Sequence, residues 1–451
     1  MPKRGVKIFL KSFGGKLNLN PTLLKEVGSR PKRREKIFMK KSRFVVEGLA
    51  GKRVLRGEIP VGGAKNAATK AIAASILFED EMPTENLPDI EDVRRMQELV
   101  AVARAGGALN PVMDKGISER MRSSVVLTGP LLARTGSVVF PFPGGCVLGE
   151  RPIDLFLQGF RALGATVEER DDLFYISGAL HGARIVFPFV SVTATETLML
   201  AAVLAQGETI LENAAMEPEI PALAEFLNTS GANIVGAGTP TITIVGTNGR
   251  LLRAEGKVFV VPPDRIEAGS FVLLAALAGS GVTVSHCEPK HVAALLTLLR
   301  RAGVKLEVGA DYITVKEGGP YTSVSVRTHE YPGFPTDLQA PMAVFLTQAT
   351  GEATILETIF DGRFRYADDL VRMGADITVM NPHKIFIKGP RALSSRELES
   401  PDLRGGLAYL IAAAVAEGTS SIDNAYLIDR GYERIEERLQ KLGLNIRRDE
   451  V

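Results

Sequence analysis

The sequence contains two cysteines, no tryptophan and no apolar run near the roughly 18 residues needed to span a membrane. Cys146 and Cys287 cannot make a disulfide framework, so we expect a reducing, cytoplasmic location and no membrane partner. The five histidines are scattered, and His286 beside Cys287 lacks partners at metal-ligand spacing. We therefore predict no metal and no cofactor. With few aromatic residues to stack on bases, no nucleic-acid partner is expected.

The charge of this 451-residue chain is unevenly distributed. Residues 1–42 contain 13 of the 54 Lys and Arg residues and 2 of the 52 Asp and Glu residues, leaving 41 basic and 50 acidic residues in the rest. We interpret 1–42 as a basic tail, expected to be disordered, without an assigned function. Binding to an anionic surface and a start site placed too far upstream are the alternatives. The remainder has the length and composition of a globular protein of two to three domains.

A glycine-rich stretch, Pro143-Gly144-Gly145-Cys146-Val147-Leu148-Gly149-Glu150-Arg151-Pro152, follows an apolar strand-like run. Glycines let a loop move and approach a ligand closely. A thiol can donate a proton or act as a nucleophile, and an arginine suits a phosphate or a carboxylate. The competing interpretation is that Cys146 is a small buried hydrophobic residue.

Two sequence markers recur along the body of the chain. The first is a helical stretch that ends in glycine and continues into a short strand, at 104–109, 161–167, 228–234, 301–306, 372–377 and 441–446. Its later copies are about 70 residues apart. The second is an alanine-rich helix, a glycine, an alternating strand and a polar loop, as in 201–213, 351–357 and 412–424. These markers predict an α/β fold of six related modules with buried helices. Polar loops from several modules would converge on one cleft suited to an anionic substrate.

Five separated motifs occur in an order that resembles the UDP-N-acetylglucosamine enolpyruvyl transferases, an EPSP synthase-like family. They are Gly63-Ala64-Lys65-Asn66-Ala67-Ala68, the segment 143–155, Pro263-Asp264-Arg265-Ile266-Glu267, Phe334-Pro335-Thr336-Asp337-Leu338-Gln339, and 428–435. The resemblance runs from about Arg43 to Arg448 and leaves only the basic tail outside.

The resemblance implies a two-domain inside-out α/β barrel built from six repeated βαβ-type units. We expect one domain at 43–60 plus 263–451 and the other at 61–262. The implied reaction transfers the enolpyruvyl group of phosphoenolpyruvate to the 3-hydroxyl of UDP-N-acetylglucosamine and releases phosphate. It is the first committed step of peptidoglycan synthesis. The sequence carries no signal for an oligomeric state.

The resemblance also implies roles for individual residues. Lys65, Arg151 and Arg430 would hold the phosphate, and Arg363 and Arg404 the carboxylate side. Cys146 would protonate the methylene carbon, and Asp337 would accept the hydroxyl proton. Nearby arginines favour the thiolate, although a general acid needs the thiol, so the bound substrate's charge would have to offset them. Further substrate contacts are expected from Asn66, Arg122, Pro152, Ile153, Asp154, Leu155, Ser191, Val192, Thr193, Ile359 and Asp402.

Simpler roles exist for several of these residues. Asp337 precedes an apolar helical stretch and can be a helix-start residue. Arg430 can form a surface ion pair with Asp429, and the segment 402–404 can be a helix start with a stabilising charge pair.

Departures from the family lie on the nucleotide side. Phe156 stands where the family usually has histidine, Phe189 where it commonly has a basic residue, and Thr193 where glycine is usual. The stretch 93–122 is about a dozen residues short, which predicts that one module lacks part of its sheet. Two alternatives follow: an enolpyruvyl transferase with a different nucleotide-sugar acceptor, and a non-catalytic anion-binding paralogue.

Overall fold

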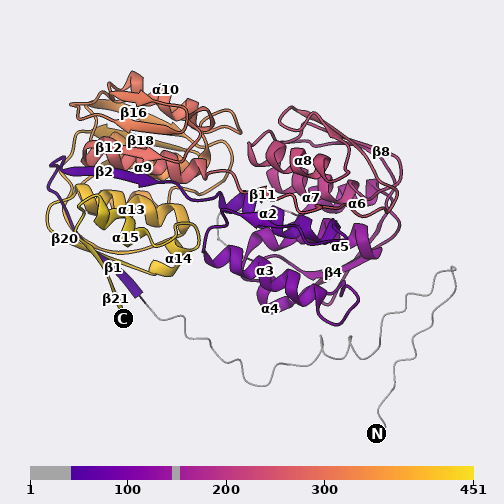
Figure 1. Cartoon of the computed structure of the whole chain (residues 1–451). Coiled ribbons are helices and arrows are strands. Elements are labelled where there is room, and N and C mark those ends of the chain that lie inside the picture. Colours follow the sequence, from indigo (N-terminus) through magenta and orange to yellow (C-terminus); the bar gives the residue numbers. More distant parts are fainter. Residues whose placement is uncertain (1–41, 145–152, 451) are drawn as a thin grey trace, which may run out of the picture. The chain divides into compact units, whose positions relative to one another are not determined.

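The computed structural model describes residues 42–144 and 153–450 (Figure 1). Their buried apolar side chains form two separate clusters. The first core gathers residues from Phe44 to Val61 and from Ile266 to Ile446. The second core gathers residues from Ala64 to Val261. The predicted α/β class is confirmed, whereas the exact domain bounds stay a prediction. Within the described ranges, no helix has the length and apolarity that a membrane crossing requires.

The first core is covered by three four-stranded sheets with one shared topology. In each sheet a parallel pair of strands is followed by two antiparallel strands. The orders are β2 (Leu55–Pro60), β12 (Gly279–Ser285), β14 (Tyr312–Val315), β13 (Leu306–Val308); β15 (Val326–Arg327), β16 (Gly351–Leu356), β18 (Lys384–Gly389), β17 (Asp376–Asn381); and β19 (Glu397–Glu399), β20 (Thr419–Asp423), β1 (Ser42–Glu47), β21 (Ile446–Glu450). In the last sheet β1 pairs with both β20 and β21, so strands from opposite ends of the described chain are neighbours.

The second core repeats this topology once in full and twice in reduced form. The full sheet runs β7 (Arg184–Val186), β8 (Glu208–Glu212), β10 (Thr241–Val245), β9 (Ile234–Val235). Another has β4 (Ser137–Pro141), β6 (Leu173–Ser177) and β5 (Thr166–Arg170), with a single parallel bridge from Val112 to Val139 at its edge. The last has only β11 (Phe259–Val260) and β3 (Thr84–Glu85).

The short stretch 93–122 accounts for the reduced β11–β3 sheet. In this fully described stretch, no hairpin follows α3 (Glu91–Arg104), and the chain turns at Gly106 and Gly107, both at positive φ. It then runs directly to the bridge at Val112. The prediction that one module lacks part of its sheet is confirmed.

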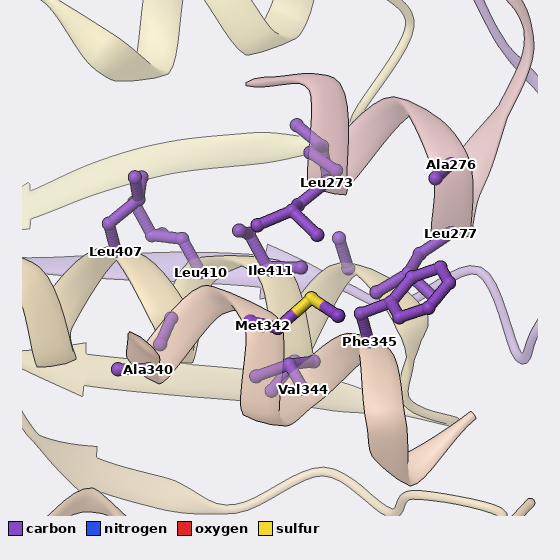
Figure 2. Packing of buried hydrophobic residues seen from close by; sticks show 14 of the residues in the cluster. Leu273, Ala276, Leu277, Ala340, Met342, Val344, Phe345, Leu407, Leu410 and Ile411 are labelled. Carbon is purple, nitrogen blue, oxygen red and sulfur yellow. The ribbon is translucent and has the colours of Figure 1, made fainter. Parts of the chain in front are cut away.

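Helices fill the interior of the first core. They are α9 (Arg265–Ala278), α11 (Gln339–Thr347) and α13 (Leu403–Val415), and nearly all their residues are buried. Figure 2 shows Leu273, Met342 and Ile411, one from each helix, pointing toward one another. The sequence markers predicted such buried helices, and that prediction is confirmed. In the second core α2 (Lys65–Ala74), α5 (Thr128–Thr135) and α7 (Val192–Ala202) are also largely buried, and α5 packs on α7.

The repeated glycines end the outer helices. Each lies two residues beyond the end of a helix and has a φ between 91° and 111°, a left-handed conformation that suits glycine. The pairs are α6 (Asp154–Ala162) with Gly164, α8 (Glu219–Thr229) with Gly231, α10 (Ala293–Arg301) with Gly303, α12 (Tyr366–Arg372) with Gly374, and α15 (Ile435–Lys441) with Gly443. The remaining short helices are η1 (Ser75–Leu77), α4 (Lys115–Ser118), η2 (Arg122–Leu127), η3 (Pro289–Val292), η4 (Thr336–Leu338) and α14 (Ala425–Asp429).

Candidate active site

Asp337 lies in η4, directly before α11, and accepts hydrogen bonds from two arginines. Arg363 Nη2 donates to Oδ1 at 2.6 Å, and Arg404 Nε donates to Oδ2 at 3.1 Å. Arg404 belongs to the first turn of α13, where the Asp402 carboxylate accepts from the backbone N–H groups of Arg404 and Gly405. The helix-start role of Asp402 is confirmed, and its substrate contact stays a prediction.

The two arginines decide the ionisation of Asp337. Burial alone would favour the neutral acid, but the charges of Arg363 and Arg404 outweigh it. The pKa of Asp337 therefore lies well below its ordinary value. Since both carboxylate oxygens accept from an arginine, a competing anion on these arginines would make Asp337 a better proton acceptor.

Glu357, at the end of β16, fixes the position of η4. Its carboxylate accepts from Thr336 Oγ1 and Gln339 Nε2, both at 2.8 Å, and from the backbone N–H of Ile359 at 2.8 Å. Arg363 Nη1 also donates to Thr336 Oγ1, at 2.5 Å. Sequence reasoning assigned no role to Glu357. The second repeat marker, which ends at this glutamate, was the available signal.

A second cluster joins Lys65 and Arg430 through Asp92. Lys65 Nζ lies 2.7 Å from Asp92 Oδ2, and Arg430 Nε donates to Asp92 Oδ1 at 2.9 Å. The Asp92 side chain is only 4% exposed. Asp429 was the expected ion-pair partner of Arg430. It accepts hydrogen bonds from Arg448 through both carboxylate oxygens instead. Asp92 was missed because it lies in none of the recognised motifs.

Charge and burial oppose each other in this cluster. Burial lowers the pKa of Lys65, Asp92 opposes that effect, and Arg430 and Arg404 add to it. Burial alone would raise the pKa of Asp92, but Lys65 and Arg430 outweigh it, and the pKa is lowered. Asp92 is therefore an anion between two cations, the place that a substrate phosphate could take.

We predict that Asp92→Asn destabilises the protein, because it removes the buried carboxylate that contacts both Lys65 and Arg430. The free energy of unfolding should fall by about 3 kcal/mol at neutral pH. Because the Asp92 pKa is lowered by folding, this contribution is present above the ordinary carboxyl pKa and is lost as the pH falls below about 4.

Thermal denaturation in chloride and in phosphate buffers of equal ionic strength tests this prediction. Phosphate should raise the melting temperature of Asp92→Asn more than that of the wild type. Asp89→Asn is the control, because the Asp89 side chain is 67% exposed and pairs with the exposed Arg94. Equal melting temperatures for wild type and Asp92→Asn in both buffers would contradict the prediction.

Tyr432 connects the two clusters. Arg404 Nη1 donates to the Tyr432 hydroxyl at 2.8 Å, and that hydroxyl lies 3.5 Å from Ser270 Oγ. Tyr432 is fully buried and follows Arg430 by two residues. Arg404 thus contacts both Asp337 and the segment that carries Arg430. The motif 428–435 contained Tyr432, although no role was assigned to it.

The residues predicted for the nucleotide side lie on separate helix starts of the second core. Arg122 begins η2, with its Cζ 5.9 Å from the centre of the Phe142 ring. Asp154 begins α6, and Ser191 caps α7 by accepting from Ala194 N at 3.3 Å. The others lie beside these or beside Lys65: Asn66 on α2, Ile153 and Leu155 at the start of α6, and Val192 and Thr193 at the start of α7. Their substrate contacts stay predictions.

The aromatic departures have different environments. Phe156 is 2% exposed and packs edge-on against Phe160 in the second core. Phe189, two residues before Ser191, is 54% exposed. Phe156 is therefore a core residue, whereas Phe189 presents an apolar side chain to solvent near the start of α7.

Three predicted site residues, Cys146, Arg151 and Pro152, lie outside the described residues. Asp337 and Arg430 are brought into one region through Arg404 and Tyr432. The approach of the Cys146 thiol to this region stays a prediction.

Comparison with known proteins identifies close relatives. A model of the EPSP synthase family (3-phosphoshikimate 1-carboxyvinyltransferase) matches residues 49–439. The chain is 41% identical over 425 residues to the UDP-N-acetylglucosamine 1-carboxyvinyltransferase of Acidobacterium capsulatum, covering 90% of this chain and 96% of that protein. It is 42% identical over 416 residues to the protein of the same name from Magnetococcus marinus, covering 88% and 98%.

Solved structures share the fold at lower sequence identity. The enolpyruvyl transferase NikO from Streptomyces tendae matches with a TM-score of 0.79 and 22% identity, covering 91% of this chain and all of that chain. An EPSP synthase from Acinetobacter baumannii matches with a TM-score of 0.67 and 18% identity, covering 90% and 100%. The predicted two-domain inside-out α/β barrel is thereby confirmed.

Proposed function

The chain belongs to the UDP-N-acetylglucosamine 1-carboxyvinyltransferases of the EPSP synthase family, and on this premise we propose the reaction that it catalyses. It transfers the enolpyruvyl group of phosphoenolpyruvate to the 3-hydroxyl of UDP-N-acetylglucosamine and releases phosphate. This is the first committed step of peptidoglycan synthesis, carried out in the cytoplasm. The structural observation that best supports the proposal is the pairing of Arg363 and Arg404 on Asp337, next to Lys65 and Arg430 on Asp92.

Phosphoenolpyruvate carries two anionic groups, and the site offers two pairs of cations. We assign its phosphate to Lys65 and Arg430, together with Arg151, and its carboxylate to Arg363 and Arg404. In the structure each pair contacts one aspartate, which offsets part of its positive charge. Binding therefore exchanges internal carboxylates for the phosphate and the carboxylate of the substrate, which limits the cost of bringing several cations together.

The same exchange prepares the base. Asp337 is held ionised by Arg363 and Arg404, which makes it a weak proton acceptor. An anion bound to these arginines weakens their hold, raises the pKa of Asp337 and lets it take the proton of the acceptor hydroxyl. Cys146 gives its proton to the methylene carbon, and the hydroxyl oxygen attacks the neighbouring carbon. The tetrahedral intermediate then breaks its bond to the phosphate, whose departure Lys65 and Arg430 stabilise, and its methyl group returns one proton to the Cys146 thiolate, which yields the enol ether.

A second candidate differs only in the acceptor. The exposed Phe189 stands where the resemblance leads us to expect a basic residue near the diphosphate. An enolpyruvyl transferase for another nucleotide sugar fits this observation. The phosphoenolpyruvate side is unaffected, because Lys65, Arg363, Arg404 and Arg430 are all present.

An acceptor panel tests the proposed function. The purified full chain is incubated with phosphoenolpyruvate and either UDP-N-acetylglucosamine or other nucleotide sugars, and phosphate release is measured with the acceptor's mass. We expect one phosphate per enolpyruvyl group gained by UDP-N-acetylglucosamine. Turnover with a different acceptor alone would establish the second candidate. No turnover with any acceptor would overturn both and favour a non-catalytic anion-binding protein.

A further inference from the structure

The motif Pro263–Glu267 has no role in the reaction described so far. Two of its charged residues have clear structural tasks. Asp264 caps α9 by accepting from the backbone N–H groups of Ile266 and Glu267. Glu267 accepts from Gly62 N at 2.7 Å and from Arg438 Nη1 at 2.6 Å. Arg265, the residue between them, points to a different set of partners.

Arg265 stands between elements of the two cores. Its Nε lies 3.7 Å from Oε2 of Glu219, the first residue of α8 in the second core. Its Cζ lies 5.7 Å from the centre of the Tyr331 ring, in the segment that leads to η4 of the first core. The side chains of Arg265 and Glu219 are only 11% and 7% exposed. This is a buried contact between cation and anion.

Several polar atoms at this contact do not form hydrogen bonds. Within the described residues, Arg265 Nε, Glu217 Oε2 and Glu219 Oε2 are buried and have no hydrogen-bond partner. Burial raises the pKa of Glu217, and Arg265 opposes that effect. A separation of 3.7 Å between Arg265 and Glu219 is longer than a charge-assisted hydrogen bond, so a small shift can tighten it.

The face of α9 that carries Arg265 also packs on Asp337's own helix. Residues four apart share one face of a helix, so Arg265 and Gly269 are neighbours on α9. Gly269 lies against Leu338, and a Cβ added there would be 2.5 Å from Leu338 Cδ1. Leu338 directly follows Asp337 in η4. This face of α9 is therefore in contact with the residue next to Asp337.

We propose that Arg265 is a positioning residue that links Glu219 and Glu217 of the second core to Tyr331 and η4, and thereby sets the position of Asp337. The inference rests on the proposed function, in which Asp337 accepts the hydroxyl proton. When α8 and α9 approach, Arg265 closes on Glu219 while its guanidinium stays on Tyr331. The carboxylate of Asp337 is then held where the acceptor hydroxyl arrives.

Steady-state kinetics of four variants test the proposal. Arg265→Met should lower kcat about 100-fold, the scale of a misplacement of about 1 Å, and leave both KM values within about threefold. Arg265→Lys should recover at least a tenth of the wild-type kcat. Glu219→Gln should lower kcat about tenfold, and adding it to Arg265→Met should have no further effect, because both changes break one contact. Melting temperatures separate this result from unfolding.

Arg253→Met is the matched control. Arg253 pairs with Glu79 on the surface, with side chains 61% and 54% exposed, and its kcat should equal that of the wild type. If Arg265→Met does not fold, kcat is measured for the double variant Arg265→Met/Glu219→Gln instead, because this variant removes both charges. A kcat within threefold of wild type for folded Arg265→Met or the double variant, or effects of the two changes that multiply, would overturn the proposal. Wild-type turnover on UDP-N-acetylglucosamine tests the proposed function separately.

Discussion

Asp337→Asn should lower kcat about a thousandfold, the central value for removal of a general base. The amide keeps the shape of the side chain but cannot take the proton of the acceptor hydroxyl. It also leaves Arg363 and Arg404 without the carboxylate that both contact. Because phosphoenolpyruvate supplies its own carboxylate, its KM should change little or fall. Phosphate release under saturating substrates measures the effect.

The stability of this variant has a predicted pH dependence. Folding lowers the pKa of Asp337, so its contribution to stability is complete above the ordinary carboxyl pKa and disappears as the pH falls through the folded value. Asp337→Asn should therefore melt below the wild type at neutral pH and approach it in acid.

Asp361→Asn is the control for both measurements, because the Asp361 side chain is 77% exposed and contacts the half-exposed His383 side chain. It should match the wild type in kcat and in melting temperature. A kcat for Asp337→Asn within tenfold of wild type would remove Asp337 from the role of base.

Cys146→Ala should lower kcat by about a thousandfold or more, because alanine cannot protonate the methylene carbon. Cys146→Asp should retain measurable turnover with a lower pH optimum. The reason is the sign of the pKa difference: an aspartic acid loses its proton near pH 4 and a thiol near pH 8.5. An acid catalyst works below its pKa, so the active range moves down with the replacement. A pH profile of kcat measures this shift.

The second cysteine supplies the matched control. Cys287 is 1% exposed in the first core, and burial raises its pKa to about 11, so it stays a neutral thiol. Cys287→Ala should leave kcat and its pH profile unchanged. Equal turnover by the wild type and Cys146→Ala would exclude the thiol from the mechanism.

The fold was predictable from the sequence because its signals are local. A glycine beyond each outer helix and an alternating strand after each buried helix occur within a few residues of the element they mark. Counting these markers predicts repeated α/β modules. The shortened stretch 93–122 predicted the reduced sheet for the same reason, since too few residues remain for a hairpin.

The partners of the site residues could not be predicted in this way. Arg430 and Asp92 are separated by 338 residues, and Arg404 and Asp337 by 67. No local sequence pattern predicts contacts between residues so far apart along the chain. The adjacent Asp429 suggested the wrong ion-pair partner for Arg430. The family resemblance identified Asp337, Arg363 and Arg404 as site residues. The roles of Asp92 and Glu357 can be recognised only in the folded structure.

The sheet that contains β1 has a consequence for synthesis on the ribosome. Among the described strands β1 emerges first, but it pairs with β20 and β21, whose residues are made some 370 to 410 positions later. The second core is continuous in sequence and can condense while translation proceeds. The first core stays incomplete until the last strand leaves the exit tunnel. Termination of translation a few residues early would therefore release a polypeptide whose second core is folded but whose first core lacks β21, the partner of β1.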